Sequence, residues 1–341
     1  AALADPPPAA IETVRTPPWK INRGGRAVRE IACEVIRLSG EGPVTIAAGG
    51  KTAAADPQAG TSARVSLFLP AAEKTAPVTL SLSCGGKTVE TRRVILSPAR
   101  ERTPADWVDP LIGTSTSRWM LYPGPSLPFG MVKLSPDNQG HDTARRLWKA
   151  GYEYTVENIM GFSHVHAWTM GGLLTMPVTG PRRIDPGPEN DPDAGYRSRF
   201  DHARETASPG YYAVTLDDYK IRAELTATTR AGFQRYTFPK AAEARILFDL
   251  ETPTEYGYTV LDAHITKISD SELAGYSTQR SGRYASWNEF TLYFVVRLSK
   301  PFDSFGGWVG PQVLLDVERI SGKGDVGGFV TYSTEQNEVI K

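Results

Sequence analysis

The sequence lacks charge asymmetry and long apolar runs, and it has little cysteine. Its 38 basic and 38 acidic side chains balance, which disfavours partners bound by electrostatic attraction, such as nucleic acid or an anionic membrane surface. No apolar run approaches the roughly 18 residues that a membrane-spanning helix needs, and no hydrophobic signal core is present. We therefore expect a protein without a membrane span whose partner carries no strong charge.

The amino-terminal residues are small and rich in proline. Residues 1–8 are Ala-Ala-Leu-Ala-Asp-Pro-Pro-Pro. Such a start is typical of an exported protein after its signal peptide has been removed. We expect a secreted or periplasmic location from these residues.

Only two cysteines occur, Cys33 and Cys84, and both lie in strand-like segments of the first hundred residues. One disulfide across a small sandwich fits this placement. Two separate thiols that pack as small apolar residues fit it equally, because pairing depends on geometry. Neither cysteine has a second ligand at C-x-x-C spacing, so no metal site is expected at either.

The chain divides into an irregular start and two regions of alternating polarity. Residues 1–18 contain five prolines and no periodicity, which predicts an irregular lead-in. Residues 19–100 alternate apolar and polar side chains between glycine and proline turns, which is typical of a small β-sandwich, Ig-like or accessory. The polar stretch 97–104 predicts a surface connector, and residues 101–341 form the second region.

The second region predicts strands throughout. β-Branched and aromatic residues dominate several runs, among them residues 213–216, 221–228, 245–250 and 291–298. No long stretch combines helical spacing of apolar residues with helix caps, so the expected fold class is all-β, with a large antiparallel β-sandwich here. Residues 324–341 are strand-like without a closing turn, which indicates that further polypeptide or a second chain supplies a pairing partner.

Unusual residues cluster around two histidines. His164 and His166 are two positions apart, so on a strand they would point the same way and could ligate a metal or hydrogen-bond a sugar together. Trp148 lies near a glycine and suits sugar binding, because an indole ring stacks on the apolar face of a pyranose. Taken alone, such histidines and tryptophans are more often structural.

Other catalytic arrangements find little support in the residues. Ser163 precedes His164, but no G-x-S-x-G elbow surrounds it. Glu153 is a candidate carboxylate, whereas the adjacent Asp217 and Asp218 would face opposite sides of a strand and instead predict a turn. The residues alone indicate a β-rich protein with a sugar-facing patch of histidine and aromatic side chains.

Several ordered segments resemble the opening of glycoside hydrolase family 92. Residues 108–114 are Val-Asp-Pro-Leu-Ile-Gly-Thr, and residues 123–137 contain Pro-Gly-Pro-Ser-Leu-Pro-Phe-Gly-Met. Further segments similar to the family follow in the same order at residues 151–154, 161–166, 176–180, 207–212, 225–230 and 236–239. Ordered blocks are far more specific than one short motif, and the resemblance covers roughly residues 105–341.

The resemblance implies an exo-acting, inverting α-mannosidase that releases terminal mannose with the help of calcium. In this family an N-terminal β-sandwich packs against an (α/α)₆ barrel, which is absent from this chain. The resemblance places the general acid, the general base and the calcium ligands on that barrel. We therefore assign no catalytic residue and no metal ligand to this chain, and we expect a glycan substrate and a downstream barrel, in cis or as a separate chain, as its partners.

The family's sandwich contributes loops to the rim of the substrate pocket. By resemblance, Trp148 is the first candidate for sugar binding, and His164, His166, Trp119 and the turn at Gly113 and Thr114 follow. The loop after the histidines, residues 167–175, is shorter than in common family members, which leaves the sugar and linkage open. Alternative functions are a non-catalytic carbohydrate-binding sandwich, an exo-glycosidase for another sugar and a purely structural module.

Overall fold

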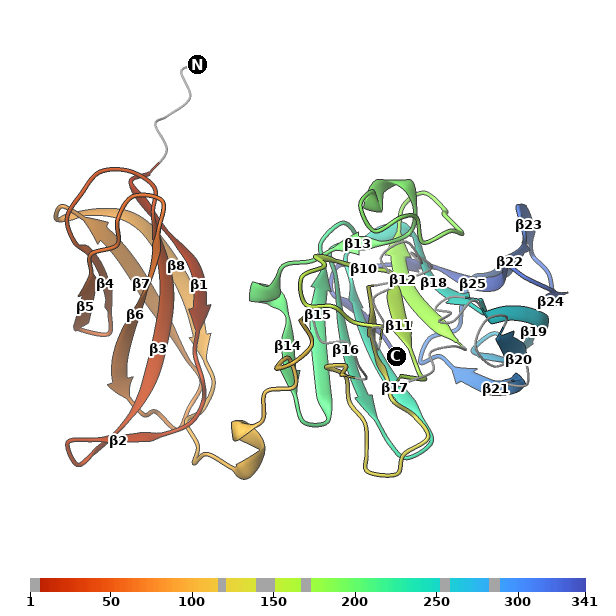
Figure 1. The fold of residues 1–341 in the computed structure, drawn as a ribbon, viewed down its shortest axis with the longest axis horizontal. Coiled ribbons are helices and arrows are strands. Elements are labelled where there is room, and N and C mark those ends of the chain that lie inside the picture. Colours follow the sequence, from red (N-terminus) through yellow and green to blue (C-terminus); the bar gives the residue numbers. More distant parts are fainter. Residues whose placement is uncertain (1–6, 116–120, 139–150, 167–172, 252–257, 282–288) are drawn as a thin grey trace, which may run out of the picture. The chain divides into compact units, whose positions relative to one another are not determined.

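The computed structural model describes residues 7–115, 121–138, 151–166, 173–251, 258–281 and 289–341 (Figure 1). The chain forms two compact units, Ala1–Asp106 and Trp107–Lys341. The boundary lies just past residues 97–104, which the sequence predicts to be a surface connector. No helix in the described ranges is long and apolar enough to cross a membrane.

The first unit contains two four-stranded antiparallel sheets. In one sheet, the central strand β3 pairs with β1, β2 and β6, and the other has the order β5-β4-β7-β8. The strands are β1 (Ala9–Arg15), β2 (Ile21–Arg23), β3 (Arg26–Arg37), β4 (Val44–Ala48), β5 (Lys51–Ala55), β6 (Ser62–Pro70), β7 (Ala76–Cys84) and β8 (Lys87–Leu96). Alternate residues of both sheets, such as Ile31 and Leu82, meet in one buried core.

The irregular lead-in predicted for residues 1–18 is wrong over β1. Ala9 and Ile11 are buried in the core, and β1 pairs with β3. The prolines lie outside this strand, so they do not prevent its pairing.

Both cysteines are free thiols in the structure. Of the two alternatives that the sequence leaves open, the structure therefore has separate thiols and no Cys33–Cys84 disulfide. Cys33 lies on β3 and Cys84 ends β7, which belongs to the other sheet. Burial raises the pKa of the Cys33 thiol to about 11, as expected for a buried, unreactive cysteine.

The second unit contains the remaining strands. They are β9 (Ser135–Asp137), β10 (Asn158–Ile159), β11 (Gly161–Ser163), β12 (Leu174–Thr179), β13 (Ser198–Arg199), β14 (Thr206–Ser208), β15 (Tyr211–Leu216), β16 (Ile221–Ala227), β17 (Gly232–Phe238), β18 (Ala241–Asp249), β19 (Tyr258–Ser269), β20 (Glu272–Ser281), β21 (Glu289–Arg297), β22 (Ser304–Val309), β23 (Gln312–Leu315), β24 (Arg319–Gly322), β25 (Val326–Thr334) and β26 (Glu338–Ile340). The helical elements in the described ranges are single 3₁₀ turns: η1 (Pro104–Trp107), η2 (Pro192–Ala194) and η3 (His202–Arg204).

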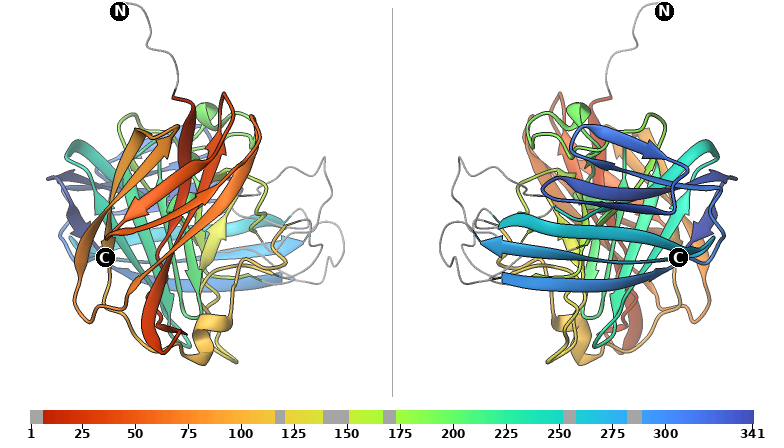
Figure 2. Two further views of the ribbon diagram at one scale, coloured as in Figure 1. Left: turned by 90° about the vertical axis from the view of Figure 1, so that its left-hand side faces the viewer. Right: turned by 90° about the vertical axis from the view of Figure 1, so that its right-hand side faces the viewer.

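These strands form three larger sheets around one core. The sheets have the orders β23-β22-β25-β18-β12-β11-β9, β14-β15-β16-β17-β26 and β21-β20-β19-β24. Figure 2 shows β19, β20 and β21 running side by side as long strands. Leu225, Phe248 and Ile265 come one from each sheet and are buried in the same cluster, so the unit has a single hydrophobic core.

The order of apolar and polar residues along a strand explains which of its side chains are buried. In β16, Ile221, Ala223 and Leu225 are buried and alternate with polar residues, as the period-two pattern predicts. Strand β18 is buried over a continuous run because it lies inside the seven-stranded sheet. The fold is all-β, as the sequence predicts.

Candidate functional site

The centre of the candidate site is a fully buried pair formed by His166 and Asp137. His166 Nε2 lies 2.9 Å from Asp137 Oδ1, and neither side chain is exposed. His166 Nδ1 lies 2.7 Å from the carbonyl oxygen of Lys133. Both ring nitrogens therefore face acceptors, which fixes the orientation of the imidazole and leaves neither nitrogen for an outside ligand.

Gly151 packs directly against this pair. Its φ of +96° is a conformation that side chains disfavour, and a Cβ there would overlap Asp137 Oδ1 and lie 2.9 Å from His166 Nε2. Only glycine fits at this position. The backbone at residue 151 is thereby held against the His166–Asp137 pair.

Asn138 and Arg197 extend the pair into a buried polar network. The Asn138 side chain donates to the carbonyl oxygens of Glu153 and Val156 and accepts from the Glu153 amide. Arg197 donates to the Asn138 carbonyl oxygen at 2.8 Å, and burial lowers the pKa of its guanidinium. The backbone N–H of Asn138 also donates to the Gly151 carbonyl oxygen at 2.8 Å. This hydrogen bond joins the two described residues that flank segment 139–150.

The predicted turn at Gly113 and Thr114 joins the same network. Gly113 has a φ of +82°, and the Thr114 hydroxyl donates to the Leu111 carbonyl oxygen. The Tyr154 amide donates to the carbonyl oxygen of Thr114 at 3.1 Å. Beyond the turn, the ring of Tyr122 lies 5.3 Å from that of His166, so both ends of the segment 116–120 lie near the network.

A second histidine–carboxylate pair lies on the other side of residues 151–154. His202 Nδ1 is 2.6 Å from Glu205 Oε2, and its Nε2 donates to the Tyr154 carbonyl oxygen. The ring of His202 stacks on Tyr154 with centroids 3.9 Å apart. Burial acts to lower the pKa of His202, but the hydrogen bond and the charge of Glu205 outweigh it, so this pKa is raised.

Two tyrosines complete this second pair. The hydroxyls of Tyr152 and Tyr212 both donate to Glu205 Oε1, at 2.7 and 2.6 Å. Burial and then the charge of Glu205 raise the pKa of both phenols well above the ordinary value. Glu205 therefore accepts three hydrogen bonds as a buried carboxylate, which ties residues 152 and 154 to β15.

His164 lies in a different environment from His166. Strand β11 ends at Ser163, so the alternation that would point both histidines the same way does not continue, and that interpretation is wrong. His164 Nδ1 donates to the Leu173 carbonyl oxygen at 3.2 Å, and burial lowers the pKa of the His164 ring. Nε2 of His164 lies 3.4 Å from the side-chain nitrogen, Nε2, of Gln234.

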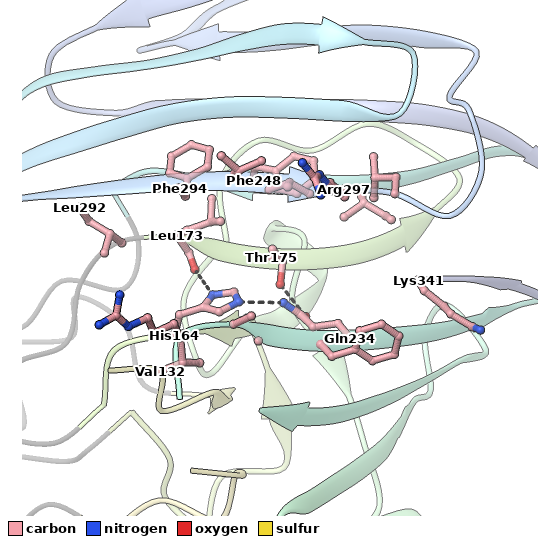
Figure 3. Close-up of a pocket in the computed structure, with 18 of the residues that line it drawn as sticks. Val132, His164, Leu173, Thr175, Gln234, Phe248, Leu292, Phe294, Arg297 and Lys341 are labelled. Atoms are coloured by element: carbon pink, nitrogen blue, oxygen red, sulfur yellow. Dashed lines mark hydrogen bonds between the residues drawn. The ribbon is translucent and has the colours of Figure 1, made fainter. Parts of the chain in front are cut away.

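His164 lines a groove of about 640 Å³ between β17 and β21, called here the β17–β21 groove (Figure 3). Apolar side chains such as Phe294 and Tyr236 dominate its walls. Neither His166 nor Asp137 lines the groove, and no pattern in the sequence predicts it.

Trp148 and Trp119 lie outside the described residues, so their places in the site stay predictions. Among the described residues, no group of three or more His, Cys, Asp or Glu side chains could hold a metal ion. The described residues therefore offer no such cluster of ligands for calcium. Asp217 and Asp218 form the turn between β15 and β16, as predicted.

Sequence reasoning missed Asp137, His202 and Glu205. Asp137 ends a proline-containing segment and lies 29 positions from His166, a separation that no local pattern encodes. His202 and Glu205 are three positions apart, which is a usable signal, because a 3₁₀ turn brings such residues together.

The family model described as "Glycosyl hydrolase family 92 N-terminal domain" matches residues 107–341. The chain belongs to glycosyl hydrolase family 92. The match covers the whole second unit, including both histidine–carboxylate pairs, and excludes the first unit. The family resemblance seen in the sequence is thus confirmed.

Similar proteins agree with membership of family 92. An α-mannosidase of this family from Bacteroides thetaiotaomicron, solved with mannoimidazole, is 30% identical with a TM-score of 0.60 over 69% of this chain and 31% of its own. The structure of the same enzyme solved without that ligand is 30% identical with a TM-score of 0.61, over 71% and 33%. A protein named an uncharacterized secreted glycosidase from Arthroderma benhamiae is 33% identical over 39% of this chain and 17% of its own length.

The chain spans about a third of the length of the solved family 92 relatives. The N-terminal domain is therefore the part that the comparisons establish, together with its membership of a glycosidase family.

Proposed function

We propose that this chain is the N-terminal part of a secreted, exo-acting α-mannosidase that inverts configuration and releases terminal mannose from glycans. In this proposal the second unit shapes the substrate pocket, and a downstream (α/α)₆ domain supplies the acid, the base and the calcium site. The similarity to an α-mannosidase solved with mannoimidazole, at 30% identity, supports the choice of sugar. The similarity to a protein named as secreted supports export.

One observation carries the pocket role: three tryptophan-bearing segments each adjoin, along the chain, residues that belong to or contact the network around His166. Segments 116–120, 139–150 and 167–172 each contain one tryptophan, Trp119, Trp148 and Trp168. Their described ends include Tyr122 on the His166 ring, the Asn138–Gly151 hydrogen bond, and His166 itself. A rigid buried network that adjoins three tryptophan-bearing segments along the chain supports a sugar-stacking role, because a preorganised site loses less entropy on binding.

Exposed apolar residues near this network support a partner domain. Ile112, Phe129 and Met131 are large hydrophobic residues that are 75%, 103% and 71% exposed. Large apolar side chains that stay exposed are typical of a protein interaction surface when they form one patch. In the proposal the downstream domain covers them, attached to this chain or as a separate chain.

The first test measures release of free sugar from aryl α-mannosides and α-linked mannan. We expect no turnover by residues 1–341 and robust turnover by the full-length protein, because inversion needs two carboxyl groups roughly 6.5–9.5 Å apart. Among the buried carboxylates that the structure describes, Asp137 and Glu205 are each committed to a histidine. Glu153 accepts a hydrogen bond from Thr155, and Asp249 accepts one from Tyr196. Turnover by residues 1–341 alone would contradict the proposal, and full-length activity that survives chelation would contradict the calcium requirement.

The second test is Trp148→Ala in the full-length protein. Losing one stacked aromatic contact should weaken glycan binding or turnover by about 1–3 kcal/mol, roughly five- to 150-fold. Trp19→Ala is the matched control, because Trp19 lies in the first unit, outside the family match. Equal activity of both variants would remove Trp148 from the pocket.

A non-catalytic carbohydrate-binding role is the competing function. It predicts that the full-length protein binds mannan with the same dependence on Trp148 but releases no sugar from any α-linked glycoside. Activity on a glycoside other than a mannoside would keep the pocket role and change the sugar.

A further inference from the structure

The β17–β21 groove lies between residues 232–235 of β17 and residues 292–297 of β21, which have no described strand on the groove side. Among the strands that the structure describes, β21 pairs with β20 alone. Strand β17 pairs with β26 over Tyr236, Thr237 and Phe238 only, which leaves residues 232–235 without a described strand on that side. Unpaired amides and carbonyls of edge strands are templates for another strand.

The groove has the lining of a sheet interior. Phe294 of β21 lies on one side of the groove, and Thr175 and Gln234 lie on the other (Figure 3). Val296 and Tyr236 also line the groove. Phe294 and Val296 also pack against the main core of the unit. An apolar groove of about 640 Å³ between two strand edges fits a peptide in extended conformation.

Strand β26 sets the direction in which such a strand runs. It is antiparallel to β17, with Ile340 opposite Tyr236. At the next residue the backbone already contacts the β21 side, because Lys341 O accepts from the Ser299 amide at 2.9 Å and the Lys341 amide donates to the Ser299 hydroxyl. Lys341 also lines the groove. A strand that continues in this register runs antiparallel to both β17 and β21.

We propose that the groove receives one β-strand, formed by polypeptide that continues from Lys341 in the register of β26. This strand joins the sheets β14-β15-β16-β17-β26 and β21-β20-β19-β24 into one continuous sheet. The matched part is about a third of the length of the solved relatives, so these relatives have enough further residues to provide such a strand. The inference does not depend on the sugar or on the catalytic mechanism.

The register also predicts the side chains of this strand. Ile340 is fully buried and Val339 is 42% exposed, so alternate positions face inward. The second, fourth and sixth residues after Ile340 should therefore be apolar, because they face Phe294 and the groove. The odd positions between them face outward and should tolerate polar residues.

Hydrogen–deuterium exchange provides the test. We would compare residues 1–341 with the same chain extended by the next twelve residues of its reading frame. In the extended chain, the groove-facing amides of β21 and of residues 232–235 should exchange about 100-fold more slowly, because they gain hydrogen-bond partners. Amides of β23, an edge strand of the seven-stranded sheet, serve as the internal control and should not change.

A matched extension with proline at the second and fourth positions after Ile340 removes ladder donors and should give no protection. If the shorter chain does not fold, the same proline substitutions in the full-length protein are compared with the unsubstituted protein. Equal exchange with and without the extension would overturn the proposal. Residues 1–341 alone could instead form a dimer, which sedimentation would detect. If β21 is protected in that dimer and the extension does not change the protection, the occupant of the groove is a second copy of the chain.

Discussion

Removing the Asp137 carboxylate should strongly destabilise the second unit. Asp137→Ala leaves His166 Nε2 with only the Ser163 hydroxyl, 3.4 Å away, as a partner, and the side chains of His166 and Asp137 are fully buried and lie 2.9 Å apart. Breaking a buried pair of this kind costs about 3–5 kcal/mol. In a domain of this size, 1 kcal/mol corresponds to roughly 2–4 °C, so the Tm of the second unit should fall by about 6–20 °C.

Asp137→Asn separates the contribution of the charge from that of the shape. The amide keeps one acceptor near His166 Nε2, and a charge-assisted hydrogen bond is roughly twice as strong as a neutral one. We therefore expect a loss of about half that of Asp137→Ala. Urea unfolding monitored by near-ultraviolet circular dichroism, with the transitions of the two units resolved, measures both variants.

Asp193→Ala is the matched control for this prediction. Asp193 pairs with Arg199 at the surface, where the two side chains are 73% and 45% exposed. Such a pair contributes at most about 1 kcal/mol. An Asp137→Ala loss no larger than that of Asp193→Ala would refute the reasoning, and so would simple additivity of Asp137→Ala and His166→Leu in a double-mutant cycle.

Three further predictions concern the neighbouring elements. The His202 pKa is raised above 6.5 in the folded protein, so the stability from its pair with Glu205 is present below pH 6.5 and is lost as the pH rises through the folded-state pKa. Unfolding of His202→Gln should thus differ most from wild type below pH 6.5, and a pH-independent difference would contradict this. Gly151→Ala should cost more than Gly210→Ala, because both have positive φ but only Gly151 has neighbours where a Cβ would lie; equal Tm values would show that the overlap is relieved. Trypsin should cut first after Arg102, close to the boundary between the units at Asp106, and earlier cutting elsewhere in either unit would argue against a connector there.

The sequence by itself determined the strands, the fold class and the family. The alternation in β16 is a local property, because every second side chain faces the core whatever strand lies beside it. The turn at Asp217 and Asp218 is equally local. The family followed from ordered blocks of residues, which are read without knowing any contact.

The tertiary structure decided which groups meet. His166 pairs with Asp137, which is 29 positions away, and that contact exists only because β9 and β11 are neighbours in one sheet. Strand β1 was missed for the same reason: its burial depends on pairing with β3, and no periodicity within residues 1–18 reports that pairing. The groove depends on which strand edges remain unpaired, a property of sheet order rather than of any segment, because strand pairing joins residues that are distant in the chain.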